Sequence, residues 1–274
     1  MEKICEPPLS AASNPIIKRG GALFMITTVL FDMGGTLEDI WVDDQSHAAA
    51  IAALDAMLKS WGLDPKLPPD ALSQSVDRGW KRYDAVRMPM DVELKPAQIW
   101  GDYILTEFDF PREILLPHCE EIAHMWEITY YYRVLRPRVK EMLEELSALH
   151  LKLGVVSNTA ALYQVFDSLE EYGIRDFFRD VTLSSVTGFR KPCRDIFTVA
   201  LRQVKSRPEE AVYVGDTVSR DVIGSKRAGF AAAVQIGSKL TKEKDQQLEK
   251  ALAPDFVVED IYDVAAVVRK LVQQ

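Results

Sequence analysis

Residues 136–274 alternate short apolar segments with amphipathic ones, and this alternation most restricts the folds open to the chain. The apolar segments include Lys152–Ser157 and Ala211–Val214, and the segments between them repeat apolar side chains at intervals of three and four. Strands that alternate with helices predict a doubly wound α/β fold, in which helices cover both faces of a parallel sheet. Ligands of such sheets bind beyond the carboxyl ends of the strands, so the residues that follow each strand are the candidates for function.

A second pattern divides the chain into two predicted domains. An apolar strand at Thr27–Phe31 belongs with the α/β pattern, whereas residues 41–135 show several amphipathic helical stripes and no convincing strand. We therefore predict a catalytic core formed by residues 25–40 and 136–274, with an all-helical insertion at 41–135. Residues 1–24 contain three prolines and no periodicity, so we expect them to form a poorly ordered N-terminal arm.

The charge and the cysteines restrict the partners. The formal net charge of -8 argues against nucleic acid and anionic membranes, because both bind dense Lys and Arg. No segment is both long and apolar enough to predict a membrane span. The three cysteines are widely spaced and form no CxxC pair, which favours a reduced, cytoplasmic setting over a disulfide framework or a zinc site. The oligomeric state stays open.

Polar residues with a shared chemistry follow the predicted strands. The candidates are Asp32 after the first strand, Ser157 and Asn158 after the second, Lys191 in an Arg-Lys-Pro loop, and Asp216 with Asp221 after Ala211–Val214. A carboxylate can attack phosphorus and give an acyl-phosphate that water then hydrolyses. Carboxylates that converge repel one another unless a hard cation lies among them, and Mg²⁺ prefers such oxygen ligands. Hydroxyl, amide and ammonium groups suit the oxygens of a transferred anion.

These motifs resemble those of the haloacid dehalogenase-like hydrolase superfamily, in its form with a helical cap. The first motif here reads Asp32-Met-Gly-Gly-Thr36, the third contains Lys191, and the fourth reads Gly-Asp216-Thr with Asp221 five residues further on. The resemblance implies that Asp32 is the nucleophile and that the insertion is the cap. It further implies the remaining roles: Ser157 and Lys191 as catalytic residues that also bind the substrate, Thr36 and Asn158 as further substrate-binding residues, and Asp32, Asp216, Asp221 and the backbone carbonyl of Gly34 as magnesium ligands.

One position departs from the family pattern. Phosphatases of the family carry a second Asp two residues after the nucleophile, which protonates the leaving group and then activates water, and this chain has Gly34 there. Losing a general acid typically lowers the rate by about 10²–10⁴-fold. Three consequences are open: a substrate with a good leaving group, a different acid such as Glu38, Asp39 or a cap residue, or a different reaction. A solvated turn is the plainer interpretation of Glu38 and Asp39.

The resulting expectation is a magnesium-dependent phosphatase that acts on a small phosphorylated metabolite through an aspartyl-phosphate on Asp32. One alternative is hydrolysis of a carbon–halogen or carbon–phosphorus bond. The metal-binding form of the fourth motif argues against a dehalogenase, and cleavage of a phosphonate needs a cap lysine, for which Lys59, Lys66, Lys81 and Lys95 are candidates. The other alternative is a catalytically weakened binding or regulatory protein of the same fold.

Overall fold

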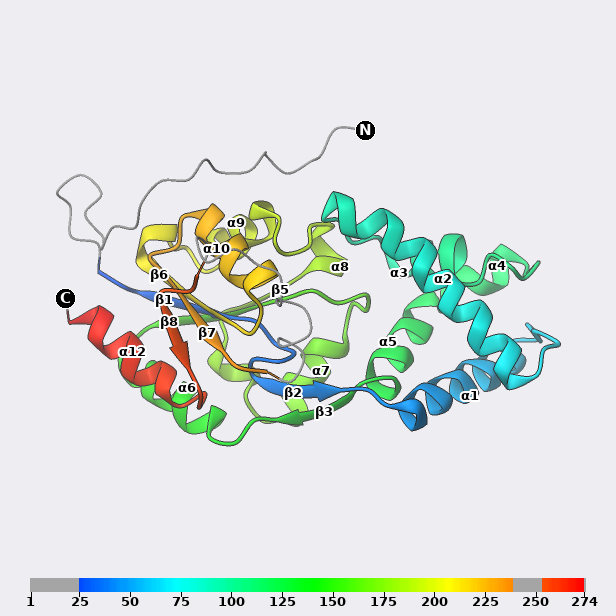
Figure 1. The fold of residues 1–274 in the computed structure, drawn as a ribbon, viewed down its shortest axis with the longest axis horizontal. Helices are drawn as coiled ribbons and strands as arrows, with labels where there is room; N and C mark the ends of the chain where they lie inside the picture. The colour runs from blue at the N-terminus through cyan, green and yellow to red at the C-terminus, as the bar shows by residue number, and fades with distance from the viewer. Residues whose placement is uncertain (1–24, 239–252, 274) are drawn as a thin grey trace.

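A computed structural model describes residues 25–238 and 253–273, so the predicted N-terminal arm lies outside the described residues. Six parallel strands form the central sheet in the order β5-β4-β1-β6-β7-β8 (Figure 1). Their bounds are Thr28–Phe31 (β1), Lys152–Ser157 (β4), Asp180–Leu183 (β5), Ala211–Gly215 (β6), Ala232–Ile236 (β7) and Phe256–Val258 (β8). The structure confirms the predicted doubly wound α/β sheet.

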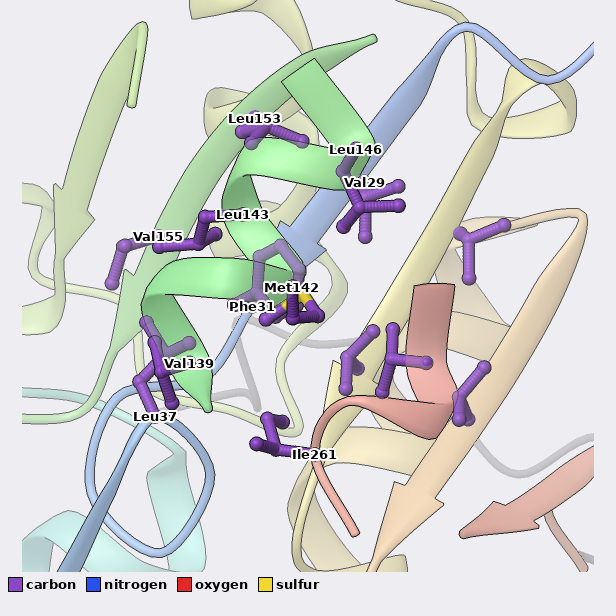
Figure 2. Close-up of a cluster of buried hydrophobic side chains, with 14 of the residues drawn as sticks. Val29, Phe31, Leu37, Val139, Met142, Leu143, Leu146, Leu153, Val155 and Ile261 are labelled. Atoms are coloured by element: carbon purple, nitrogen blue, oxygen red, sulfur yellow. The ribbon is translucent and has the colours of Figure 1, made fainter. Parts of the chain in front are cut away.

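Helices cover both faces of this sheet because β1 is apolar on both sides. Val29 and Phe31 pack towards α6 (Val139–Ala148) and α12 (Asp263–Val272), and Figure 2 shows their side chains gathered with those of α6. Leu30 points to the opposite face, where it packs against α9 (Arg194–Gln203). A strand buried on both faces reads as an uninterrupted apolar run, which is why residues 29–31 show no polar alternation.

The helical insertion has its own core. Helices α1 (Asp44–Ser60), α2 (Pro69–Met90) and α5 (Cys119–Thr129) pack around Trp100 and Tyr83, both fully buried. In Figure 1 these helices form a lobe beside the sheet.

The remaining described elements of both lobes are short. They are the helices α3 (Pro96–Gln98), α4 (Arg112–Leu115), α7 (Gln164–Glu171), α8 (Ser184–Thr187) and α10 (Ile223–Ala228), the π-helical turns at Ile99–Ile104 and Val218–Val222, and the 3₁₀ turns at Leu116–His118, Arg175–Phe177 and Pro208–Glu210.

A two-stranded ribbon joins the two lobes and corrects one expectation. Strand β2 (Glu38–Trp41) pairs antiparallel with β3 (Tyr132–Leu135), so the stretch predicted to contain no strand contributes one. The partner strands lie more than 90 residues apart, so local periodicity gives no sign of their pairing. The domain boundaries stay a prediction. No helix among the described residues is long and apolar enough to cross a membrane.

Candidate active site

The parallel sheet brings the predicted residues to one edge. Asp32 directly follows β1, Ser157 ends β4 and Asp216 directly follows β6, and these three strands are neighbours in the order β4-β1-β6. The backbone amide of Asp32 donates to the carbonyl of Val214, which extends the pairing of β1 with β6 up to the site. Adjacent parallel strands that end together present their next residues to the same space.

Lys191 lies between two of the carboxylates. Its Nζ is 2.6 Å from Oδ1 of Asp32 and 2.8 Å from Oδ1 of Asp221, and the lysine is 3% exposed. Burial raises the pKa of Asp32, and the charge of Lys191 opposes that rise. Burial would raise the pKa of Asp221 as well, but Lys191 and Arg220 lower it to about 2. Lys191 therefore favours the ionised form of both carboxyl groups.

Asp221 and Asp216 are held by Thr217 of the fourth motif and by Ser238, which lies outside the motifs. The amide and hydroxyl of Thr217 donate to Oδ2 of Asp221 at 3.0 and 2.6 Å. The hydroxyl of Ser238 donates to Oδ2 of Asp216 at 2.7 Å, and Arg220 lies 3.8 Å from the other oxygen. Burial, followed by the charges of Asp221 and Asp32, raises the pKa of Asp216 to about 7.

The three carboxylates fit a hard metal ion. Asp32, Asp216 and Asp221 each offer an oxygen, these oxygens lie within 4.8 Å of one another, and all three residues are buried. Lys191 contacts two of the acids and Arg220 lies further from the third, so a dipositive ion would relieve the remaining repulsion. Oxygen donors alone match the preference of Mg²⁺. Gly34 lines the pocket next to Asp32.

Ser157, Asn158 and Lys191 line a pocket above Asp32, with a volume of about 690 Å³. Asn158 fixes the third-motif loop, because its side chain accepts from the amide of Lys191 at 2.9 Å and donates to the carbonyl of the same residue at 3.1 Å. Thr36 does not line this pocket. It is fully buried, and its hydroxyl has no hydrogen-bond partner among the described residues.

The helical lobe and the ribbon supply the other walls of the pocket. Arg87 of α2 lines it, whereas the lobe's aromatic residues Trp80, Tyr83, Trp100, Tyr103 and Trp126 do not. Glu127 of α5 and Arg133 of β3 also line it. Among the described residues that line the pocket, Lys191 is the one lysine, so Lys59, Lys66, Lys81 and Lys95 all lie elsewhere.

The helical lobe docks on the loop that carries Lys191. Glu93 donates its backbone amide to Gly188, and Arg190 donates its own to Asp91 at 2.8 Å. The buried carboxylate of Glu93 also contacts the Arg190 guanidinium and accepts from the Ser184 hydroxyl. The lobe therefore contacts the residue next to Lys191.

A buried carboxylate cluster at the edge of a parallel sheet, beneath a helical lobe, defines the class of haloacid dehalogenase-like hydrolases. Residues 106–234 match the family model described as haloacid dehalogenase-like hydrolase. The glyceraldehyde 3-phosphate phosphatase of Methanopyrus kandleri is 30% identical over 250 residues, covering 90% of this chain and 99% of that protein. The phosphatase of the same name from Methanothermobacter thermautotrophicus is 33% identical, covering 86% and 97%. The chain belongs to the haloacid dehalogenase-like hydrolase family.

Solved structures agree on the fold. A HAD phosphatase from Thermococcus onnurineus matches with a TM-score of 0.58 at 21% identity, covering 89% of this chain and 98% of that one. A 2-haloacid dehalogenase from Pseudomonas syringae pv. Tomato matches with a TM-score of 0.60 at 23% identity, covering 90% and 99%. At these identities the likeness supports the fold alone, so it does not separate the two chemistries.

Proposed function

We propose that this protein is a magnesium-dependent phosphatase of small phosphorylated metabolites. The observation that carries the proposal is the convergence of Asp32, Asp216, Asp221 and Lys191 in one buried cluster, of which Asp32 and Lys191 line the pocket. The names of the two archaeal relatives, both glyceraldehyde 3-phosphate phosphatases, support phosphate ester hydrolysis. Three carboxylates suit a metal-assisted reaction, which disfavours a metal-free dehalogenase. The lack of a cap lysine among the described pocket residues disfavours a Schiff base with a phosphonate.

The side chains suggest the course of the reaction. A carboxylate oxygen of Asp32 attacks phosphorus, the bond to the leaving oxygen breaks, and an aspartyl-phosphate forms. The charge of Lys191 opposes the raised pKa of Asp32, and Lys191, Ser157 and Asn158 would bind the oxygens of the transferred group. Water then attacks phosphorus, the bond from phosphorus to the Asp32 oxygen breaks, and both protons of the water leave with the released phosphate, so that Asp32 returns to its free carboxylate. Mg²⁺, held by Asp32, Asp216, Asp221 and the Gly34 carbonyl, would supply charge neutralisation.

A screen of phosphate compounds tests the proposal. The purified protein is assayed for phosphate release from acyl, aryl, sugar and triose phosphates, each with Mg²⁺ and with excess EDTA. We expect turnover of at least one class, and loss of that turnover in EDTA. Inactivity on all of them, or metal-independent halide release from a 2-haloacid, would contradict the proposal.

Mg²⁺ is expected to stabilise the fold more strongly at pH 8 than at pH 6. The pKa of Asp216 is about 7 in the folded protein, above its ordinary value of 3.8, so folding favours its protonated form. The stability that this group contributes is therefore lost progressively as the pH rises from 3.8 to about 7, and above about 7 the ionised carboxylate is available to the metal. At 100 times its Kd, Mg²⁺ should add about 2.7 kcal/mol to the free energy of unfolding.

Thermal unfolding with and without Mg²⁺ at the two pH values measures this effect. Asp216→Asn should abolish most of the Mg²⁺ shift, and without metal it should be more stable than the wild type at pH 8. Asp109→Asn, a change at an exposed loop carboxylate, is the matched control and should behave as the wild type. An equal Mg²⁺ shift in the wild type and Asp216→Asn would place the ion elsewhere.

A further inference from the structure

The space beside Gly34 is occupied by the ribbon. A Cβ atom built on Gly34 would lie 3.0 Å from Cδ1 of Ile40 and 3.7 Å from Oε1 of Glu38. Both residues belong to β2, and their side chains lie on one face of it because they are two positions apart. Glu38 is fully buried rather than part of a solvated turn, which corrects the plainer interpretation of the sequence. Asp39 points to the other face, where it pairs with Arg136 at 3.0 Å.

Arg133 is the charged group that this face of the ribbon presents to the pocket, which Ile40 also lines. It is directly opposite Ile40 in the antiparallel register, so its side chain emerges beside that of Ile40. Its guanidinium contacts Oε1 of Glu38 with one nitrogen and Oε2 of Glu127 with the other, at 2.6 Å for the second contact. Arg133 lines the pocket together with Asp32 and Gly34, whereas Glu38 does not.

Neither carboxylate in this cluster is suited to protonate a leaving group. Glu38 is shielded, because it accepts from Arg133 and from the Tyr172 hydroxyl and has no exposed surface. Glu127 lines the pocket, but Oε2 of its carboxylate is occupied by the Arg133 guanidinium, which donates to it at 2.6 Å. The two acids instead fix the guanidinium in place, since both contacts are charge-assisted.

We propose that Arg133 is a catalytic residue that binds the leaving-group oxygen as an anion, and that the site therefore accepts phosphates of acidic leaving groups. This inference rests on the proposed phosphatase function and names its substrate class: acyl, enol and aryl phosphates. The bond from Asp32 to phosphorus forms, the bond from phosphorus to the leaving oxygen breaks, and the electron pair stays on that oxygen. No proton is transferred in this step, and the guanidinium stabilises the charge that develops.

The dependence of the wild-type rate on the leaving group is the primary test. The value of kcat/KM is measured with Mg²⁺ for acetyl phosphate, 4-nitrophenyl phosphate, phenyl phosphate and glycerol phosphate. We expect a steep fall along this series, with 4-nitrophenyl phosphate favoured over glycerol phosphate by more than about 10²-fold, the least that an absent general acid costs. Comparable rates for the aryl and alkyl phosphates would overturn the inference and leave the phosphatase function standing. Inactivity on every compound would refute both.

An Asp introduced at position 34, where the family's general acid lies, should make kcat/KM depend less on the leaving group. Gly34→Asp alone is crowded by Cδ1 of Ile40, so the variant is Gly34→Asp with Ile40→Val, which removes that atom. Ile40→Val alone is the matched control. The double variant should gain on glycerol phosphate relative to 4-nitrophenyl phosphate by about 10²-fold or more. An unchanged ratio in a folded double variant would show that the site already possesses a proton donor.

Removing Arg133 should make kcat/KM depend more steeply on the acidity of the leaving group. Arg133→Met should lower kcat/KM more for phenyl phosphate than for 4-nitrophenyl phosphate, because the poorer leaving group carries more charge. Arg78→Met, which removes an exposed cap arginine paired with Glu107, is the matched control and should lower neither. An equal loss on both substrates would indicate a structural role for Arg133. Should Arg133→Met fail to fold, Arg133→Lys, which keeps a positive charge between Glu38 and Glu127, is compared on the same two substrates, and an equal loss on both would again indicate a structural role.

Discussion

Asp32→Asn is expected to lower kcat/KM by about 10⁴-fold or more, the scale seen when the nucleophile of a covalent mechanism is removed. The amide of asparagine has nearly the same shape, but it does not attack phosphorus. The oxygen of the introduced amide can still accept the Met33 amide hydrogen that now reaches Oδ1 of Asp32 at 2.8 Å, so the loop should keep its course. The loss would then report chemistry rather than folding.

Phosphate release and trapping of a labelled phosphoenzyme after acid quench measure this effect. The wild type should incorporate label from a good substrate, and Asp32→Asn should incorporate none. Asp109→Asn, which changes an exposed carboxylate in the same way, should keep full activity and labelling. More than a tenth of the wild-type activity in Asp32→Asn, with normal thermal stability, would remove Asp32 from the role of nucleophile.

Much of the site was predictable because its residues lie where parallel strands end. The apolar run before Asp32 and the run before Asp216 each identify a buried strand, and neighbouring strands must deliver their next residues to one edge. Lys191 follows no strand directly, and the family resemblance indicated its role. The structure places all three residues together, although their catalytic roles stay predictions.

The parts that the sequence did not reveal depend on contacts between distant segments. Strand β3 forms only because Tyr132–Leu135 meets Glu38–Trp41 across the helical lobe. Ser238 reaches Asp216 from the end of β7, and nothing in its local sequence marks it as a partner. Glu38 reads as polar and therefore as exposed, yet Arg133 and Tyr172 satisfy it inside the protein. Buried ionic groups of this kind are identified by their partners rather than by their own pattern.

Lys191→Met is expected to separate the two functions of the lysine, which are to stabilise the fold and to support catalysis. The change leaves Asp32 and Asp221 buried without the cation that now lies within 2.8 Å of both. Breaking a buried ion pair from one side typically lowers the free energy of unfolding by about 3–5 kcal/mol. Activity should fall by at least about 10²–10³-fold, the effect of removing one group that stabilises developing charge. It should fall further because Asp32 loses the charge that opposes its raised pKa.

Adding Asp221→Asn to Lys191→Met distinguishes the two effects. The double variant has one buried negative charge fewer, so denaturant unfolding in EDTA should show that part of the lost stability returns. Activity should not return, because Asp32 still lacks its cation, the transferred group still lacks the ammonium and the proposed metal site has lost Asp221. If the double variant regained activity along with stability, Lys191 would act only as a structural counter-charge and Asp221 would not be a required metal ligand. If Lys191→Met alone kept its stability, water would have to reach both carboxylates, contrary to their near-complete burial.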